Sequence, residues 1–512
     1  MPILNNLKIL IPLASKDLDF EKEFNKLKSL TPIGENSMIK FFVNNFKLDA
    51  EYIFLCREKD LIDSNLLIEL QSLKVNKKII GIPKDTSSSI ETVFYAEKYV
   101  KNDDKILIAH PDGINFYKKK EFNKFLKTSN ADGFVCAFNE DSQSNTSETH
   151  TGRISVKRQK ILRVIEKSIR TKDTMRLAGI YYFRRFDEYL RYAKKTLSNQ
   201  LPVRGRHFIS QIFNEYIKSK KKIKIFKFEK HIGLGLISYV KEYNFWFKYF
   251  KKKDNKKKEK FNFLNIIPAC GDGERFTKEN KNSFKPLIKL NNNNMVTTAI
   301  KSLPISKKNV VIIRKDHNKK YQFKQKILKN NKNTEVLVLN KKTSGMASTC
   351  YEYLKDMKRN DQLLISSCDY DIVYDSKKLR KIINFFSPDV LIWTFKNYPD
   401  ARISPFAYAY CIVENGKVTG ISEKKPISDT PHKDHIAQGV FYFKSKKIFM
   451  EAYRNMINEE NKINNEYYVG NSINNLIKKG YKILPFEVDQ YICLGTPQDL
   501  KVYNFWKTYF ND

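Results

Sequence analysis

The sequence lacks any apolar run of the roughly 20 residues that a membrane-spanning helix requires. Its first 20 residues show neither a basic leader nor a small-residue cleavage site, so we expect a first strand there rather than a signal peptide. The seven cysteines have no paired spacing, which indicates reduced thiols. Together these absences predict a cytoplasmic protein without membrane insertion.

Acidic residues are scarce beside basic ones, 56 against 94, which gives a net charge of +38. An excess of this size can indicate nucleic-acid binding. The lysines are spread along the whole chain instead of forming one stripe, so a nucleic-acid partner is not expected. The net positive charge is by itself enough to attract small anions such as nucleotides and sugar phosphates.

Two segments about half a chain apart are similar in sequence. Residues 231–250 and 491–510 align without a gap, and both contain Tyr-Asn-Phe-Trp. Since 512 residues are too many for one hydrophobic core, the repeat predicts two copies of one domain, residues 1–250 and 261–512. Residues 251–260, KKKDNKKKEK, repel one another and predict a solvated linker, with a polyanion or membrane-surface contact as the alternative.

Short apolar runs alternate with longer amphipathic stretches in both copies. This alternation predicts an α/β fold with two tandem domains, each with a mostly parallel central sheet flanked by helices. Ligands of such sheets bind at the carboxyl ends of the strands. The predicted strands are residues 7–13, 51–56, 77–82, 105–110 and 133–138 in the first copy, and 263–269, 309–314, 335–340, 362–367 and 390–395 in the second.

A glycine loop follows the first strand of the second copy. Gly271 and Gly273 would let the backbone approach a ligand and present N–H groups to phosphate oxygens. Arg275 and Lys285 add two cations near the loop, an arrangement that suits a triphosphate whose leaving group is pyrophosphate. Taken alone, the Gly-x-Gly pattern equally describes a tight turn.

Three further motifs follow in the second copy. Asp369 and Asp371 come at a strand's carboxyl end, where carboxylates can hold Mg²⁺ against phosphates, although an Asp-rich turn is an equal alternative. The small-residue loop around Gly345 and Ala347 opens a helix, either passing close to a base or ribose or simply capping the helix. In the last motif, Glu423-Lys424, the glutamate could accept sugar hydroxyls and the lysine could meet a phosphate.

This ordered set resembles the nucleotidyltransferase family that makes nucleoside-diphosphate sugars and related activated alcohols. Members have a first strand, a G-x-G-x-R-F loop and then K-P-L, which stand here at Gly271–Phe276 and Lys285–Leu287. The resemblance continues through the Asp369 loop, Glu423-Lys424, and the segments at 439–443, 465–469 and 494–500. It covers nearly all of residues 263–512, and is nearest to the branch encoded with capsule and surface-polysaccharide genes.

The resemblance implies a GT-A-like, Rossmann-related fold and a defined reaction. An NTP and a phosphorylated sugar or alcohol would give an NDP-linked product and pyrophosphate, with Mg²⁺ as cofactor. By resemblance, Arg275, Lys285 and Lys424 are catalytic, the first two on the triphosphate and the third on the acceptor phosphate. The resemblance further assigns nucleotide binding to Gly271, Gly273, Arg275, Gly345 and Ala347, substrate binding to Glu423, Lys424 and Gly439, and the metal to Asp369 and Asp371.

One position departs from the family pattern. Many members have a second metal-binding Asp two residues before the Gly of the Gly-Thr motif, where this chain has Cys493. Either Asp371 or Asp489 substitutes, or Asp369 and the nucleotide hold the metal. The oligomeric state is open between a homo-oligomer and a chain whose two copies replace a homodimer.

The first copy keeps counterparts of several motifs and loses the glycine loop. Lys28 matches Lys285, and Asp112 matches Asp369, but both glycines are missing and Asp19 stands opposite Arg275. A carboxylate there would repel a triphosphate, so we expect no nucleotidyl transfer by residues 1–250. The first copy would then stabilise or regulate the second, or bind a different sugar or nucleotide.

Two other functions fit parts of the pattern. Asp369-Tyr370-Asp371 matches the Asp-x-Asp signature of GT-A glycosyltransferases, which use a ready-made nucleotide sugar and do not need the loop from Gly271 to Lys285. A non-catalytic nucleotide-binding scaffold would account for Cys493.

Overall fold

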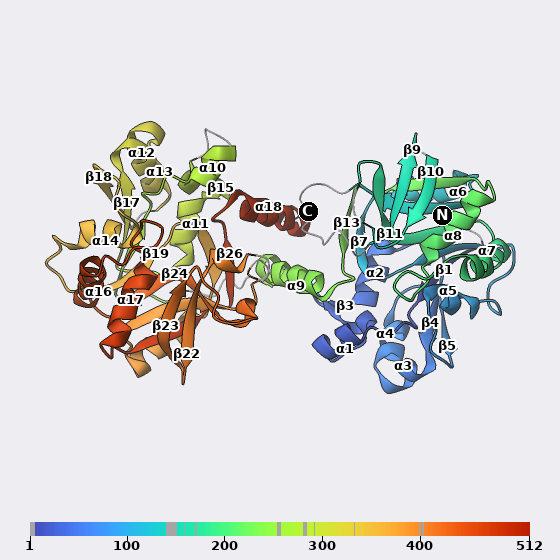
Figure 1. The fold of residues 1–512 in the computed structure, drawn as a ribbon, viewed down its shortest axis with the longest axis horizontal. Helices are drawn as coiled ribbons and strands as arrows, with labels where there is room; N and C mark the ends of the chain where they lie inside the picture. The colour runs from blue at the N-terminus through green and yellow to red at the C-terminus, as the bar shows by residue number, and fades with distance from the viewer. Residues whose placement is uncertain are drawn as a thin grey trace. The chain divides into compact units, whose positions relative to one another are not determined.

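The computed structural model describes residues 6–139, 151–158, 160–168, 171–252, 258–279, 284–290, 292–331, 333–398, 401 and 404–511 (Figure 1). The chain divides into two compact units, Met1–Phe245 and Trp246–Asp512. The division falls inside helix α9 (Ile237–Lys252), which includes the first two residues of the lysine-rich segment. Residues 253–257 of that segment lie outside the described residues. Among the described helices, none has the length and apolarity to cross a membrane.

The first unit is built on a nine-stranded sheet. Its strands β1, β4, β5, β6, β8, β9 and β12 share one direction, and only β10 and β11 run the other way, so the sheet is mostly parallel, as predicted. The main path runs β10-β9-β11-β6-β1-β4-β5, with β8 on β11 and β12 on β8. The bounds are β1 (Leu7–Pro12), β4 (Glu51–Arg57), β5 (Lys77–Ile82), β6 (Lys105–Ala109), β8 (Gly133–Phe138), β9 (Arg153–Lys157), β10 (Lys160–Ile165), β11 (Thr174–Phe183) and β12 (Ile223–Lys227).

Both faces of this sheet are covered. The central strands read as unbroken apolar runs because helices bury them on each side, and one core lies on either face. Small ribbons join β2 (Pro32–Ile33) to β3 (Asn36–Ser37) and β7 (Gly113–Phe116) to β13 (Lys230–Gly233). Besides α9, the helices are α1 (Leu18–Phe24), α2 (Met38–Phe46), α3 (Glu58–Asp63), α4 (Leu66–Ser72), α5 (Ser89–Phe94), α6 (Lys119–Thr128), α7 (Phe186–Asn199) and α8 (Ile212–Lys218).

The second unit repeats this sheet strand for strand. Its path runs β18-β17-β14-β19-β24, with β21 and then β25 beyond β24, and with β22 and β23 branching from β24. Only β23 and β24 oppose the common direction. The bounds are β14 (Phe263–Pro268), β17 (Lys308–Arg314), β18 (Thr334–Leu339), β19 (Gln362–Ser366), β21 (Val390–Phe395), β22 (Ala409–Glu414), β23 (Lys417–Glu423), β24 (His435–Phe443) and β25 (Ile483–Glu487).

The helices of the second unit follow the same order, and Figure 1 shows α16 and α17 side by side. Its ribbons pair β15 (Lys289–Leu290) with β16 (Asn293–Asn294) and β20 (Tyr370–Val373) with β26 (Gln490–Cys493). A π-helical turn, Ile382–Phe386, continues α15. The helices are α10 (Glu274–Glu279), α11 (Met295–Ser302), α12 (Lys315–Tyr321), α13 (Phe323–Asn330), α14 (Met346–Leu354), α15 (Ser376–Lys381), α16 (Lys446–Asn458), α17 (Val469–Lys478) and α18 (Pro497–Asn511).

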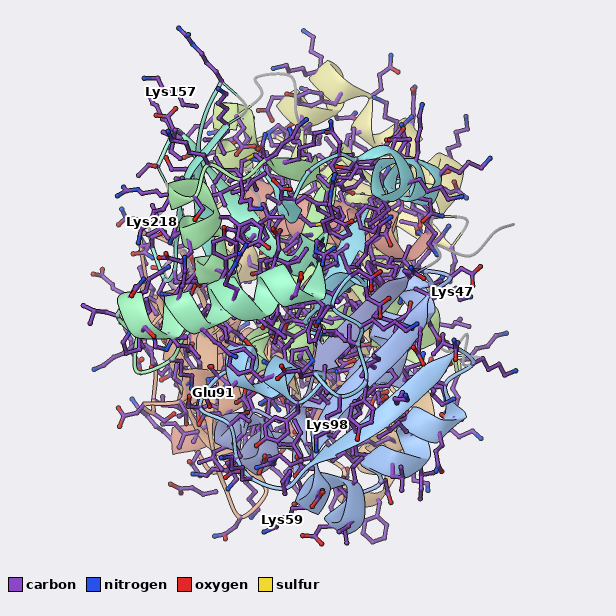
Figure 2. The ribbon with its side chains drawn as sticks, turned by 90° about the vertical axis from the view of Figure 1, so that its right-hand side faces the viewer. Lys47, Lys59, Glu91, Lys98, Lys157 and Lys218 are labelled. Atoms are coloured by element: carbon purple, nitrogen blue, oxygen red, sulfur yellow. The ribbon has the colours of Figure 1, made fainter. Side chains whose placement is uncertain are left out.

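The ten strands predicted from apolar runs are all present, which confirms the α/β fold class. Each element boundary differs from the prediction by no more than a residue or two at these strands. The exposed lysines come from separate elements rather than from one stripe. Figure 2 shows this for one face of the first unit, where Lys47, Lys59, Lys98, Lys157 and Lys218 lie far apart in the chain and are exposed.

Candidate functional site

A cavity of about 240 Å³ opens in the second unit where β14, β18 and β19 end. This is the edge at which parallel α/β sheets bind ligands, because the loops there are free to present side chains and backbone N–H groups. The lining residues come from five segments of the sequence: Pro268, Ala269, Cys270, Gly271 and Gly273; Lys285 and Pro286; Lys342, Thr343, Gly345, Met346 and Thr349; Ser367, Cys368 and Asp369; and Glu466.

The glycine loop forms one wall and is braced by ion pairs. Gly273 has a φ of 64°, and a Cβ there would lie 3.0 Å from the Lys285 Cβ, so only glycine allows this approach without strain. Asp272 between the glycines accepts from Lys342 Nζ at 2.6 Å and also pairs with Arg314. The loop is therefore held in place, while Gly271 faces open space that a ligand can fill.

The Lys285–Asp369 ion pair lies next to this loop, with Nζ 2.6 Å from Oδ2. Burial alone would lower the pKa of Lys285, but the charge of Asp369 outweighs it and holds that pKa above its usual value. Burial would likewise raise the pKa of Asp369, yet Lys285 keeps it below the usual value. Both groups are therefore charged at neutral pH. A Cβ on Gly495 would lie 3.2 Å from the Asp369 carboxylate, so the backbone passes close to this pair.

Gly345 begins helix α14 at another wall. Its φ of 106° and ψ of −179° lie in a region open essentially to glycine alone. A Cβ there would lie 2.7 Å from the backbone nitrogen of Tyr467, because that residue bonds across the loop. The Tyr467 N–H donates to Ser344 O, and its carbonyl accepts from the Ala347 N–H. The missing side chain at Gly345 therefore lets the backbone of Tyr467 pack against the start of α14.

Glu423 ends β23 and Lys424 follows it directly, near the charges of Arg275 and Glu466. Burial lowers the pKa of Lys424, and the nearby charge of Arg275 lowers it further, whereas Glu423 raises it. Lys424 holds a left-handed φ of 59° and donates to Ala407 O at 2.5 Å. Burial raises the pKa of Glu423, and among the described residues no hydrogen-bond donor reaches its carboxylate. A carboxylate in this position is available to accept hydroxyl groups from a ligand.

The predicted site residues separate into three groups. Five line the cavity: Gly271, Gly273, Lys285, Gly345 and Asp369. Arg275, Glu423 and Lys424 lie near one another just outside that lining. Three do not line it: Ala347, whose side chain is buried in the core; Gly439, whose carbonyl accepts from the Ser367 N–H; and Asp371, whose carboxylate accepts from the Tyr249 hydroxyl.

Sequence reasoning missed the side chains that brace the loops. Lys342 and Arg314 reach Asp272 from separate segments, and Glu466 contributes to the cavity wall. The charged residue between the two glycines was the only local signal for this network, since a buried or half-buried carboxylate needs a cationic partner.

The donor set near the cavity fits a magnesium ion that arrives with phosphates. No cluster of three or more His, Cys, Asp and Glu ligands occurs among the residues that the structure describes. Asp369 supplies one carboxylate, and Mg²⁺ is usually bound by one or two carboxylates together with substrate phosphates and water. Burial raises the pKa of Cys493 well above its usual value, and its thiol donates to Asp499, so it stays protonated and is no magnesium ligand. The Asp371 carboxylate does not belong to this donor set, because it accepts a hydrogen bond from the Tyr249 hydroxyl.

No known family profile matches the sequence, and no curated protein matches it. The structure is similar to a nucleoside-diphosphate-sugar pyrophosphorylase from Vibrio cholerae RC9, with 20% identity and a TM-score of 0.39 over 47% of this chain and 98% of that one. It is also similar to the inositol-1-phosphate CTP transferase from T. maritima, with 15% identity and a TM-score of 0.39 over 48% and 95% of the two chains. Because these identities and TM-scores are low, the function has to be argued from the geometry of the site.

The first unit carries a counterpart of the same ion pair. Lys28 Nζ lies 3.0 Å from Asp112 Oδ2, and the two residues are 84 positions apart, as Lys285 and Asp369 are. Lys28 is also 3.3 Å from Asp17, a second carboxylate that Lys285 does not have among its ion pairs in the described chain. Asp19 is the second residue of α1, as Arg275 is of α10.

The cavity at this point in the first unit is smaller, about 70 Å³, and lined by carboxylates. The acidic lining residues are Asp17, Glu21, Asp60 and Asp112. Two cations, Lys28 and Arg57, share this lining, and Arg57 is engaged by Asp60 at 2.6 Å. The lining thus has four carboxylates against two cations, and the sequence has no glycine loop at this point.

Proposed function

We propose that the second unit is a nucleotidyltransferase that transfers a nucleoside monophosphate from an NTP to a sugar phosphate or similar phosphate and releases pyrophosphate. The observation that carries the proposal is the glycine loop at Gly271 and Gly273 packing against Lys285 of the Lys285–Asp369 pair, with the loop and the pair lining one cavity at the strand ends. Backbone N–H groups, a partly buried ammonium and a carboxylate are groups that suit a metal-bound triphosphate.

The reaction needs positioning and charge stabilisation rather than a protein nucleophile. An oxygen of the acceptor phosphate attacks the α-phosphorus in line, the new P–O bond forms, and the bond to the β-phosphate oxygen breaks as pyrophosphate leaves. Lys285 and Arg275 would stabilise the charge that develops on the phosphates. Asp369 would hold Mg²⁺, which neutralises phosphate charge when it is bound. Lys424 would orient the acceptor phosphate.

Glu423 supports a hydroxyl-bearing acceptor. Its carboxylate is largely buried beside Gly470, and a Cβ on that glycine would lie 2.4 Å from Oε1. The first unit has Ser210 in the position of Gly470, and its hydroxyl donates to Glu166, the counterpart of Glu423. The carboxylate of Glu166 therefore accepts a hydrogen bond from a serine hydroxyl, whereas that of Glu423 lies beside a glycine. Without a serine at this position, Glu423 can accept hydrogen bonds from the hydroxyls of a sugar. By its resemblance to the capsule branch, we place the product in surface-polysaccharide precursor synthesis.

We also propose that the two units are copies of one domain and that the first is catalytically silent. Matched details support the duplication beyond the strand order. The side-chain amide of Asn214 forms two hydrogen bonds with the backbone of Val164, and that of Asn474 forms the same two with the backbone of Ile421. Lys167 has a left-handed φ of 52° where Lys424 has 59°. We expect no catalysis by the first unit because Asp19 stands at the position of Arg275 and because carboxylates line its smaller cavity.

The Asp-x-Asp alternative has less support. A glycosyltransferase of that kind uses both carboxylates at one metal, but here Asp369 faces Lys285 and Asp371 faces Tyr249. Sugar transfer from a ready-made nucleotide sugar, without pyrophosphate release from any NTP, would revive this alternative. Nucleotide binding without turnover would instead favour a scaffold.

Pyrophosphate release, measured over a panel of NTPs and sugar phosphates with Mg²⁺, tests the proposed function. We expect release with at least one pair, and we expect Arg275→Ala to lower kcat/KM by about 10²-fold, as the loss of one charge-stabilising donor usually does. Lys278→Ala is the matched control, because Lys278 is an exposed cation on the same short helix, whereas Arg275 is the cation whose charge acts on Lys424. Undiminished release by Arg275→Ala would count against the assigned role.

Gly470→Ser should impose the first unit's arrangement on the second. The new hydroxyl would engage Glu423, so KM for the acceptor should rise about tenfold, the effect of one lost hydrogen bond to a charged group, while KM for the NTP stays the same. Steady-state kinetics with each substrate varied in turn measures this. Ser210→Gly, the reverse change in the first unit, should leave both constants unchanged. Equal rises of both KM values would contradict a role of Glu423 in acceptor binding.

A further inference from the structure

The last turns of α9 are part of the second unit's core. Trp246, Tyr249 and Phe250 all belong to the compact unit that begins at Trp246. They pack on α18: the ring centroids of Phe250 and Tyr503 are 5.6 Å apart, and those of Phe250 and Phe510 are 5.9 Å apart. Trp246 and Tyr249 are each only 4% exposed. The helix therefore brings a fixed side-chain layer to this unit.

Within this layer, the Tyr249 hydroxyl donates a hydrogen bond to the Asp371 carboxylate. Asp371 is 6% exposed, and its other oxygen accepts from the Ile372 N–H at 2.8 Å. A buried carboxylate is costly unless donors surround it, so these bonds hold Asp371 in one place. Because Asp371 belongs to β20, they also hold the strand.

Strand β20 in turn sets the position of Asp369. Tyr370 pairs with Cys493, and Asp371 pairs with Ile492 in the ribbon of β20 and β26. The Leu494 N–H donates to the carbonyl of Asp369 at 3.0 Å, which ties the residue before β20 to the same ribbon. A shift of this ribbon would therefore move the carboxylate that meets Lys285.

The first unit does not have this arrangement. The residue that occupies Asp371's place in the matching ribbon, β7 with β13, is Ile114, which pairs with Ile232 as Asp371 pairs with Ile492. Ile114 is 5% exposed and offers no carboxylate. The buried Tyr–Asp bond accordingly belongs to the unit that keeps the glycine loop and is missing from the unit that lost it.

We propose that Tyr249 is a positioning residue for the nucleotidyl-transfer site: through Asp371 it fixes β20 where Asp369 meets Lys285. This inference rests on the proposed function for its kinetic consequence. Its structural consequence, an ordered β20, stands independently. Asp371 then acts through the strand and does not contact the metal or the substrates.

The test uses the full chain with Tyr249→Phe, and with Tyr243→Phe as the control that removes a hydroxyl from the same helix. Tyr249→Phe should lower kcat about tenfold, the effect of one buried hydrogen bond to a charged group. KM for the acceptor should not change, because Glu423 and Lys424 lie on another strand. Amide hydrogen exchange of residues 369–373 should be faster than in Tyr243→Phe.

A double-mutant cycle separates positioning from general destabilisation. Asp371→Ala should lower kcat as Tyr249→Phe does, the double variant should be no slower than Asp371→Ala, and Asp371→Asn, which still accepts the bond, should recover part of the loss. Unchanged exchange of residues 369–373 in Tyr249→Phe, an unchanged kcat, or additive effects in the cycle would each overturn the proposal. If the unaltered protein releases no pyrophosphate, the proposed function fails, and the exchange experiment alone decides whether Tyr249 fixes the strand.

Discussion

Replacing Lys285 by alanine should lower the rate of pyrophosphate release by about 10³-fold, equivalent to about 4 kcal/mol of transition-state stabilisation. The effect is expected to be this large because Lys285 is the one ammonium group paired to Asp369 in the described part of the cavity, and its charge is fixed there before substrate arrives. Charge that develops on the phosphates would lose a preorganised partner. Initial rates at saturating NTP and acceptor measure the change in kcat.

The chain offers its own control for this variant in Lys28→Ala. Lys28 pairs with Asp112 as Lys285 pairs with Asp369, and both lysines are partly buried; Lys285→Ala removes the partner of Asp369, and Lys28→Ala removes that of Asp112 and Asp17. The cost in stability should therefore be at least as large for Lys28→Ala, and thermal unfolding can measure it for both variants. Turnover should survive only in Lys28→Ala. Comparable loss of turnover in both variants would contradict a catalytic role confined to the second unit.

Gly345→Ala should destabilise the second unit by about 3 kcal/mol and prevent nucleotide binding. The backbone there lies in a glycine-only region, which costs roughly 1–3 kcal/mol for another residue. A methyl group would also overlap the backbone of Tyr467, which cannot move without breaking its bonds to Ser344 and Ala347. Denaturant unfolding gives the change in free energy, and titration with a fluorescent NTP analogue gives the change in Kd.

Gly416→Ala separates the two causes. Gly416 has a φ of 75° in the turn between β22 and β23, and nothing lies within 4 Å of a Cβ at that position. This variant carries the backbone cost without the overlap, so we expect a loss of about 1 kcal/mol and unchanged nucleotide binding. Equal losses in the two variants would show that the contact with Tyr467 is unimportant.

The strands could be predicted because each is a short apolar run, a pattern that depends on local sequence alone, and the central ones are buried on both faces. Gly271, Gly273 and Asp369 could be placed at one edge of the sheet for the same reason, since each follows a predicted strand closely, and Lys285 was placed there by its nearness in sequence to the glycine loop. Asp371 could not be separated from Asp369 in this way. Its direction depends on Tyr249, a residue 122 positions earlier in the chain.

The ion pairs that hold the glycine loop in place could not be predicted from local sequence either. Lys342 and Arg314 reach Asp272 across 70 and 42 positions, and either lysine or arginine is common throughout this basic chain. Ala347 belongs to a loop that does line the cavity, but its own side chain points into the core at the start of α14. Which residues of a correctly predicted loop face the ligand depends on the tertiary contacts of that loop.

The aromatic turns of α9 determine where this protein can be cut for further study. The lysine-rich segment looks like the natural place to begin a shorter fragment. A fragment that starts at residue 261 would nevertheless lose Trp246, Tyr249 and Phe250 and would uncover Tyr503 and Phe510 of α18. Apolar surface exposed in this way promotes aggregation. A fragment meant for crystallisation or enzymology should therefore include all of α9, even though most of that helix precedes the lysines.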